Sequence, residues 1–329
     1  MIVATAAAPA PTRQDDGVRS TEAARRRRNA LLTLLGLAAT VSFVVGASSG
    51  SNGEAESDTE EPLPPSAELP GGGQTMFPDR RVVAIYGAPQ DPQLGALGIG
   101  TPDEAGEELE KQGAQYERAD RPVLPAMELI STIAAADPGD DGDHNFRQPD
   151  RVIDRYLEAA RDRDALLILD IQPGYADFMD EVRRLEPYLR EPDVGLALDP
   201  EWSVEPPAIP GQVIGSVDAE TINEVSAYLD GLVTAERLPQ KLLVVHQFTD
   251  DMIAAREMLE ERPNVTPVLN SDGFGDIPQK KVKYDELSPQ GPTREFDAGF
   301  KLFYLEDFPV MTPKQVLDLK PQPDLVVYE

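Results

Sequence analysis

The 329-residue chain contains no cysteine, only two histidines and a single tryptophan. Without cysteine it forms neither a disulfide framework nor a thiolate zinc site. The two histidines show no H-x-H or H-E-x-x-H spacing, which excludes a zinc site built from several imidazoles. The sequence also lacks a G-x-S-x-G nucleophile motif and the glycine spacing of a dinucleotide-binding loop. We therefore expect no bound cofactor and no metal site.

Basic residues are scarce. The chain has 30 Lys and Arg against 59 Asp and Glu, a formal net charge of −29. A surface this negative repels phosphate backbones, so we expect no nucleic-acid partner. The only dense basic run is Arg25 to Arg28, which precedes the part of the chain expected to fold.

That basic run closes a tail, residues 1–28, and is followed at residues 29–47 by the uncharged stretch NALLTLLGLAATVSFVVGA. At a rise of about 1.5 Å per residue this stretch is long enough to span a bilayer as a helix. Positive charge before it predicts that the tail stays in the cytoplasm and that all later residues are exported. We expect either a membrane anchor or, with cleavage after Ala47, a signal segment and a secreted domain.

Two further regions follow. Residues 48–78 are rich in Ser, Gly, Glu and Pro and lack a periodic apolar face, which predicts a disordered linker. Residues 79–329 are left for the folded domain, a length typical of one barrel.

In that domain eight short apolar runs alternate with amphipathic stretches. The alternation is typical of βα units and a parallel sheet. Eight runs predict an α/β fold, a (β/α)8 TIM-type barrel lacking a clear final helix, with a doubly wound open sheet as the alternative. The runs span 82–87, 122–129, 165–173, 194–202, 241–248, 265–273, 300–307 and 324–329.

Helices are expected between the runs, where apolar residues recur three or four apart. Thr101, Asp177, Asp218 and Thr312 are the expected N-caps. The stretch 280–291 shows only a weak helical pattern. The expected helices lie within 103–116, 150–164, 176–191, 219–236, 250–262 and 312–319.

In parallel βα folds the site forms at the carboxyl ends of the strands, because the loops that follow the strands meet there. Nearly every apolar run ends in a side chain that ionises or forms hydrogen bonds, and we expect these side chains to bind substrate. The expected substrate-binding residues are Tyr86, Glu128, Asp170, Gln172, Trp202, His246, Gln247, Asp272 and Tyr328.

The fourth run ends in LDPEW, which brings Asp199, Glu201 and Trp202 together. Glycoside hydrolysis needs one acid, a second carboxylate and an aromatic face for the sugar. Positions two apart in an extended strand face the same side, so both carboxylates of this run can face one site.

Acidic residues at the ends of the fourth and seventh runs resemble the arrangement in the large clan of retaining glycoside hydrolases on (β/α)8 barrels. The resemblance implies Glu201 as acid/base and Glu306 as nucleophile, although Asp199-Pro200 stands where that clan usually has Asn before its fourth-strand Glu. The D-x-E of Asp199 and Glu201 is also similar to the end of the chitinase-type signature, in which the Asp supports a catalytic Glu. The upstream Asp-rich strand ending of that signature is missing here.

Over about residues 80–329, the blocks YGAP, LDIQPG, DPEW, GQVIGSVDA and LPQKLLVVHQF resemble a group of exported actinobacterial barrel proteins of unassigned activity. This resemblance bears on fold and export rather than on a reaction.

These features together predict an extracytoplasmic, glycoside-hydrolase-like barrel that acts by paired carboxylates. Its expected partner is a carbohydrate, either a cell-envelope polymer or an environmental polysaccharide. Two alternatives stay open. One is a non-catalytic barrel of the cell envelope that binds carbohydrate or peptide in the same cleft. The other is a metal-dependent hydrolase, in which His246 joins oxygen ligands from Asp170, Asp199, Glu201 and Asp272.

Overall fold

The structure, a computed structural model, describes residues 66–290 and 296–329. The predicted basic tail (1–28), the predicted membrane or signal segment (29–47) and the first part of the predicted linker lie outside the described residues. Within the described part of the chain, no helix combines the length and the apolar character needed to cross a bilayer.

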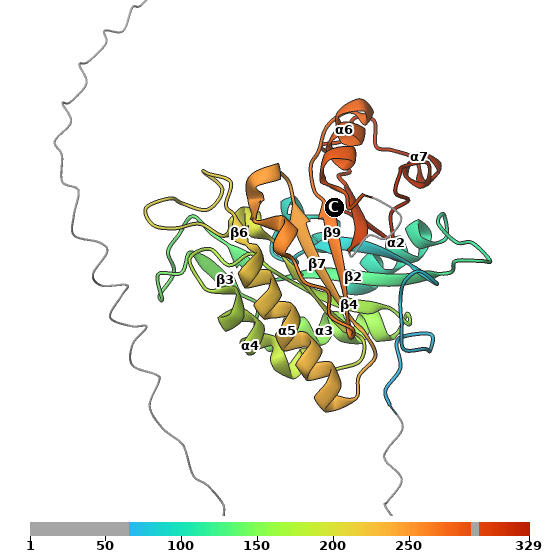
Figure 1. Ribbon diagram of the computed structural model, residues 1–329, viewed down its shortest axis with the longest axis horizontal. Coiled ribbons are helices and arrows are strands. Elements are labelled where there is room, and N and C mark those ends of the chain that lie inside the picture. Colours follow the sequence, from blue (N-terminus) through green and yellow to red (C-terminus); the bar gives the residue numbers. More distant parts are fainter. Residues whose placement is uncertain (1–65, 291–295) are drawn as a thin grey trace, which may run out of the picture. The chain divides into compact units, whose positions relative to one another are not determined.

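Eight parallel strands form a closed barrel (Figure 1). Each barrel strand pairs with the barrel strand that follows it in the sequence. The barrel closes because the first strand, β1, pairs with both β2 and the last strand, β11. The predicted barrel is thus confirmed, and the open sheet is ruled out. The barrel strands are β1 (Arg81–Gly87), β2 (Val123–Ala134), β4 (Leu166–Ile171), β5 (Val194–Leu198), β7 (Lys241–Gln247), β9 (Val265–Ser271), β10 (Asp297–Leu302) and β11 (Leu325–Tyr328).

Helices cover the outside of the barrel, and Figure 1 shows α3, α4 and α5 along one side of it. All four predicted N-caps accept a hydrogen bond from a backbone N–H in the first turn of their helix. The helices are α2 (Pro102–Gly113), α3 (Asp150–Arg161), α4 (Phe178–Leu189), α5 (Ala219–Glu236), α6 (Ile277–Leu287) and α7 (Pro313–Leu317).

Shorter elements occupy the connections. β3 (Asn145–Arg147) pairs antiparallel with the end of β2, and β6 (Val217–Asp218) pairs with β8 (Ile253–Ala254). The 3-10 turns are η1 (Pro92–Leu94), η2 (Ala96–Gly98), η3 (Pro200–Trp202), η4 (Asp250–Met252) and η5 (Arg256–Met258).

One predicted helix is absent. Residues 250–262 form two 3-10 turns around β8 instead. Ala255, with φ of 54°, adopts a left-handed conformation that ends any helical run.

Conversely, the stretch with the weak helical pattern contributes most of α6. A capping box starts this helix, because the Asp276 side chain accepts from the Gln279 backbone N–H and the Gln279 side chain accepts from the Asp276 backbone N–H. Such reciprocal bonds stabilise a helix start that has little apolar periodicity behind it.

The barrel interior is apolar from the amino-terminal ends of the strands to about their middle. Side chains of alternate strand residues, such as Val82 and Ala84 on β1, fill it. Leu69 and Met76 belong to the same buried cluster, and the Gln240 backbone N–H donates to the Gln74 carbonyl. Leu69 and Met76, which lie in the stretch predicted to be a linker, thus pack in the same core as the barrel strands.

Candidate functional site

Above these apolar layers each strand turns a polar side chain inward at its carboxyl end. The alternation of the strands requires this placement. On β7, for example, Leu242 and Val244 face the interior core, and His246 continues the series. These inward side chains form one ring, to which every strand of the barrel contributes. The ring consists of Tyr86, Glu128, Asp170, Asp199, His246, Asn270, Lys301 and Glu329.

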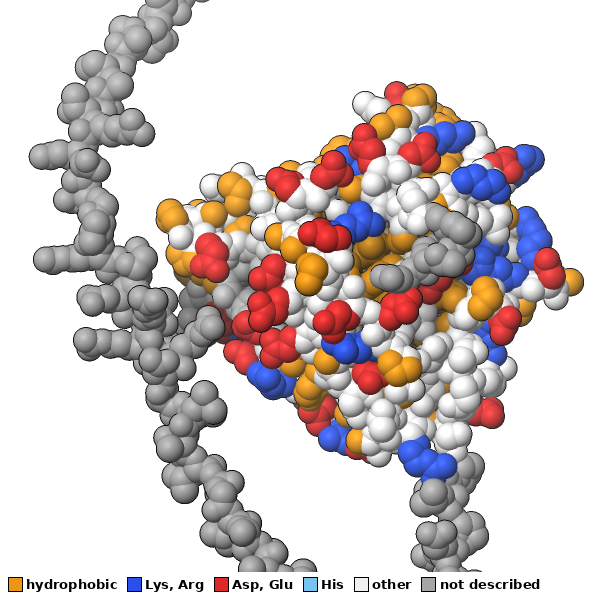
Figure 2. Space-filling model, viewed as in Figure 1, with side chains coloured by type: hydrophobic (Ala, Val, Ile, Leu, Met, Phe, Trp, Pro, Cys, Tyr) orange, Lys and Arg blue, Asp and Glu red, His pale blue; other side chains and the backbone are white. Residues whose placement is uncertain are grey.

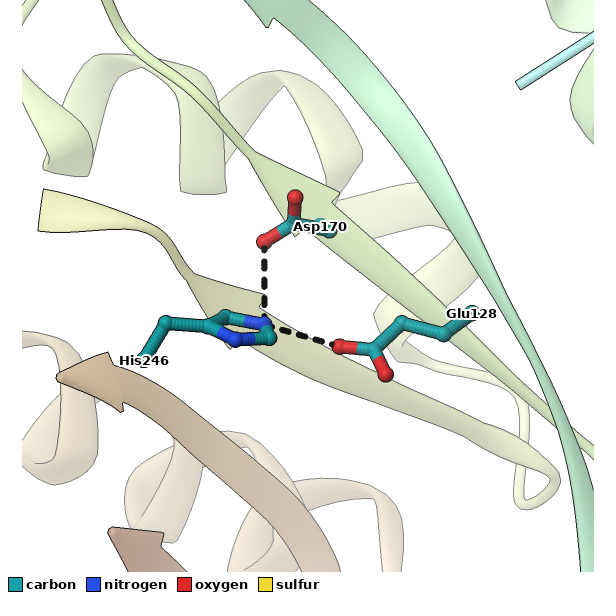
Figure 3. Close-up of side chains that lie close together, drawn as sticks. All are labelled: Glu128, Asp170 and His246. Carbon is teal, nitrogen blue, oxygen red and sulfur yellow. Dashed lines mark hydrogen bonds and ion pairs between the residues drawn. The ribbon is translucent and has the colours of Figure 1, made fainter. Parts of the chain in front are cut away.

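His246 is a fully buried member of the ring, and Figure 3 shows its imidazole between Asp170 and Glu128. Its Nε2 lies 3.0 Å from Glu128 Oε1 and 3.9 Å from Asp170 Oδ1, and its Nδ1 lies 3.0 Å from Asp272 Oδ2. Burial alone would lower the pKa of His246, but the hydrogen bonds to Asp272 and Glu128 outweigh it and raise the pKa well above its usual range. The ring therefore holds His246 as an imidazolium.

Lys301 is the second cationic side chain of the ring and is also buried. Its Nζ lies 3.1 Å from Asp272 Oδ2 and 2.7 Å from Glu329 Oε2, and 3.7 Å from the centre of the Tyr86 ring. Acids and bases thus alternate from Glu128 through His246, Asp272 and Lys301 to Glu329. Sequence reasoning missed Lys301. The sequence does carry a signal for it, since Lys301 stands between the apolar residues Phe300 and Leu302. Side chains alternate along a strand, so when these two face the helices, Lys301 points into the barrel.

Asp272 is ionised by this arrangement. Burial would raise its pKa, but the Lys301 ammonium and the His246 ring outweigh burial and hold the pKa far below its usual range.

Asp170 is held differently. Burial raises the pKa of Asp170 to about 6, with Glu128 adding to the effect and His246 opposing it. The Tyr86 hydroxyl donates to Asp170 Oδ2 at 3.0 Å, and the Gln172 amide donates to the Tyr86 hydroxyl at 3.1 Å. Tyr86, Asp170 and Gln172 therefore form one buried hydrogen-bonded group.

A cavity of about 270 Å³ opens above the ring. Residues at the ends of the strands and in the loops after them form its wall, as expected for a (β/α)8 barrel. Its lining residues are Tyr86, Gln93, Leu94, Ile130, Ala134, Gln172, Asp199, Glu201, Trp202, Phe248, Asp272, Gly273, Phe274, Lys301, Phe303 and Glu329.

The turn η3 positions the carboxylates of the DPEW motif in this wall. Trp202 Nε1 donates to Asp199 Oδ2 at 3.0 Å, which fixes the indole beside the carboxylate. The Gly215 backbone N–H donates to the Glu201 carbonyl at 2.6 Å, and a Cβ at Gly215 would lie 2.2 Å from the Ser203 carbonyl oxygen. Only glycine allows this close packing of the loop that carries Glu201.

The pKa values of both carboxyls in this turn are raised. Burial raises the pKa of Asp199 well above its usual value, and the nearby Asp170 and Asp272 add to the effect against His246. Burial also raises the pKa of Glu201, and Asp272 adds to it. The cavity wall therefore contains two acids whose pKa values are shifted in opposite directions, Glu201 upward and Asp272 downward.

The structure brings most of the predicted residues together but not all. Glu306 lies in an exposed turn after β10 and is not part of the cavity wall. Its neighbour Asp307 is the buried acid of that turn, where it accepts from the backbone N–H groups of Gly275 and Phe303 and pairs with Lys280 at 3.0 Å. The resemblance that assigned Glu306 a catalytic role thus does not correspond to its position.

Gln247 and Tyr328 also lie outside the cavity wall. Each is one residue away from an inward member of the ring, so alternation turns it outward. Gln247 donates to the Thr249 carbonyl at 3.1 Å, and the Tyr328 hydroxyl lies 2.7 Å from the Tyr116 hydroxyl. Their predicted substrate-binding role does not fit this placement.

Among the described residues, Glu128, Asp170 and His246 are the group whose donor atoms lie close enough, within 4.8 Å of one another, to hold a metal ion. None of the three lines the cavity. Both nitrogens of His246 face carboxylate oxygens at hydrogen-bonding distance, so a protonated ring satisfies Glu128 and Asp272 together. The ion-pair network accounts for this geometry by itself.

The chain matches no protein-family model and no curated protein. The class of protein is therefore defined by the fold and the site alone. It is a (β/α)8 barrel whose carboxyl-terminal face carries a cavity walled by carboxylates and aromatic rings.

Proposed function

We propose that this barrel is a glycoside-hydrolase-like protein that acts on a cell-surface or environmental polysaccharide by means of paired carboxylates. The observation that carries the proposal is the pair Glu201 and Asp272. Both line one cavity, and their surroundings shift their pKa values in opposite directions. Opposed pKa shifts are the usual way in which one site provides an acid and a base at the same pH.

Glu201 is the proposed general acid. Its raised pKa keeps the proton available for the leaving glycosidic oxygen, and its side chain is only partly buried, so the proton faces the cavity. This role is the one that the sequence assigned to it.

Asp272 takes the second role in place of Glu306. Its carboxylate either attacks the anomeric carbon, which expels the leaving group as Glu201 protonates it, or removes a proton from the water that attacks instead. Lys301 and His246 keep Asp272 ionised for either course. Retention of the anomeric configuration in the product would indicate the first course and inversion the second.

Asp199 is proposed to orient the cavity wall. Its bond to the Trp202 indole holds an aromatic face beside the reacting acid, and sugar rings stack on such faces.

Nucleic acid does not fit as a partner, because acidic side chains are spread over the visible face of the domain (Figure 2) and the chain carries a net charge of −29.

The test is release of reducing ends from a panel of cell-wall and storage polysaccharides, using the intact protein and Glu201→Gln. We expect turnover on at least one polymer and a loss of at least about 100-fold in the variant, the usual contribution of a positioned general acid. An intact protein that binds a polymer without cleaving it would support the non-catalytic alternative. Full activity in the variant would contradict the assignment.

Export is part of the same proposal, and it rests on the apolar segment 29–47 with arginines before it. Protease treatment of intact cells that express the full chain tests it. Digestion of the barrel domain without cell lysis supports an extracytoplasmic site, and full protection contradicts one.

A further inference from the structure

Carboxyl groups outnumber cationic side chains among the described residues that line the cavity. Its carboxyl groups are those of Asp199, Glu201, Asp272 and Glu329, whereas Lys301 is the only lysine or arginine that the described part of the chain places in the wall. Lys301 is already engaged by Asp272 and Glu329. The remaining two carboxyls, on Asp199 and Glu201, therefore face the cavity without a cation.

Their oxygen atoms are also short of hydrogen-bond donors. Asp199 is 3 % exposed, and its Oδ1 has no hydrogen-bond partner among the described residues. The Glu201 carboxyl has neither a hydrogen bond nor an ion pair within that part of the chain. A buried acceptor without a donor, such as Asp199 Oδ1, destabilises the empty cavity, and a ligand with N–H groups would remove this cost.

Aromatic rings complete the wall, and the protein itself shows how an ammonium group sits against them. The Lys301 ammonium lies 3.7 Å from the centre of the Tyr86 ring and 5.3 Å from that of Phe303. Trp202, Phe248 and Phe274 line the same cavity. Carboxylates together with ring faces are the surroundings in which proteins bind organic cations.

We propose that the cavity binds a ligand carrying a protonated amine, with Asp199 and Glu201 as its counter-charges. Given the proposed function, on which this step rests, the ligand is a glycan with free amino groups rather than an N-acetylated, neutral or acidic one. The burial that raises the pKa of both carboxyls in the empty cavity is offset when an ammonium group lies beside them. A uronic acid would instead add a further negative charge to the wall.

The test is calorimetric titration of the intact protein at low ionic strength with four oligosaccharides of equal length. These are glucosamine, N-acetylglucosamine, glucose and glucuronic acid oligomers. We expect the glucosamine oligomer to bind at least about tenfold more tightly than the glucose oligomer, and the glucuronic acid oligomer to bind least. Equal affinity for the glucosamine and glucose oligomers would overturn the inference.

Variants locate the effect. Asp199→Asn and Glu201→Gln should each lower the affinity for the glucosamine oligomer about tenfold more than the affinity for the glucose oligomer. Glu306→Gln removes a carboxylate outside the wall and is the matched control. If Asp199→Asn fails to fold, the partly exposed Glu201 still provides the test. Unchanged binding of the amine by Glu201→Gln would overturn the inference.

Binding and cleavage separate this inference from the proposed function. Tight binding of the amine without cleavage of any polymer would refute the hydrolase and retain the amine site. Cleavage of neutral polymers without preferential binding of the glucosamine oligomer would support the hydrolase and refute the amine site.

Discussion

Asp272 Oδ2 lies 3.0 Å from His246 Nδ1, at the point where the buried ring of polar side chains meets the cavity. The same oxygen lies 3.1 Å from Lys301 Nζ. Two cations on one carboxylate oxygen keep Asp272 ionised inside the barrel, while burial raises the pKa of Glu201 in the same cavity wall. The account of the site depends on this difference between the two acids.

The pH dependence of catalysis follows from that difference. kcat/KM should rise as Asp272 ionises, below the usual range of carboxyl pKa values, and fall as Glu201 loses its proton, above that range. A wide plateau across mildly acidic pH is therefore expected in a profile of initial rates. A profile with an acid limb at the ordinary carboxyl pKa would show that Asp272 is not the ionised partner.

Stability should depend on pH through Asp170. Its pKa of about 6 lies above the unfolded value of 3.8, so its contribution is complete below the unfolded value and is lost as pH rises through the folded one. Asp170→Asn should remove this loss, a gain relative to the parent of at most about 3 kcal/mol at pH 7 compared with pH 4. Urea unfolding at both pH values measures it. Parallel losses in the parent and the variant would argue against a raised pKa.

Gly299 leaves room for Asn270, whose amide nitrogen lies 3.2 Å from His246 Nδ1. A Cβ at Gly299 would lie 2.5 Å from Asn270 Oδ1. Gly299→Ala should lower the free energy of unfolding by about 1–3 kcal/mol, as overpacking of a core does. Gly231→Ala is the control, because a Cβ at this exposed position in α5 meets nothing within 4 Å and should stabilise the helix by about 1 kcal/mol. Equal effects of the two changes would mean that Asn270 is not confined.

Because both ring nitrogens of His246 already face carboxylate oxygens of Glu128 and Asp272, we expect that folding does not require a metal ion. Dialysis against a chelator should leave the midpoint of thermal unfolding unchanged, whereas Glu128→Gln should lower stability by about 3–5 kcal/mol because it breaks a buried charge pair. A lower midpoint after chelation, restored by one divalent metal, would favour the metal-dependent alternative.

Sequence patterns were sufficient for the barrel because its strands and most of its helices are local features with strong periodicity. They also located most of the ring, since alternation and strand ends are readable in a run such as VVHQF. Sequence patterns did not determine which of two adjacent residues at the end of a strand points into the barrel. Gln247 and Tyr328 are adjacent to inward residues, and the direction in which a strand end points depends on its pairing in the barrel.

Two other differences between the expected and the observed positions have physical causes of the same kind. Glu306 and Asp307 are both acidic, and only the hydrogen bonds that fold the turn after β10 bury Asp307 and expose Glu306. Lys301 was overlooked because lysine usually marks a solvent-exposed position. Its burial becomes understandable only once Asp272 and Glu329, which are distant in the sequence, lie beside it.

The most direct test of the central claim compares Asp272→Asn with Glu306→Gln in hydrolysis of whichever polymer the intact protein cleaves. Both changes replace a carboxylate by an amide of nearly equal size, but only Asp272 lines the cavity. The account predicts that Asp272→Asn loses at least about 1,000-fold in kcat, as removal of a catalytic group does, and that Glu306→Gln keeps the parent rate. Loss of activity in Glu306→Gln with an active Asp272→Asn would contradict it.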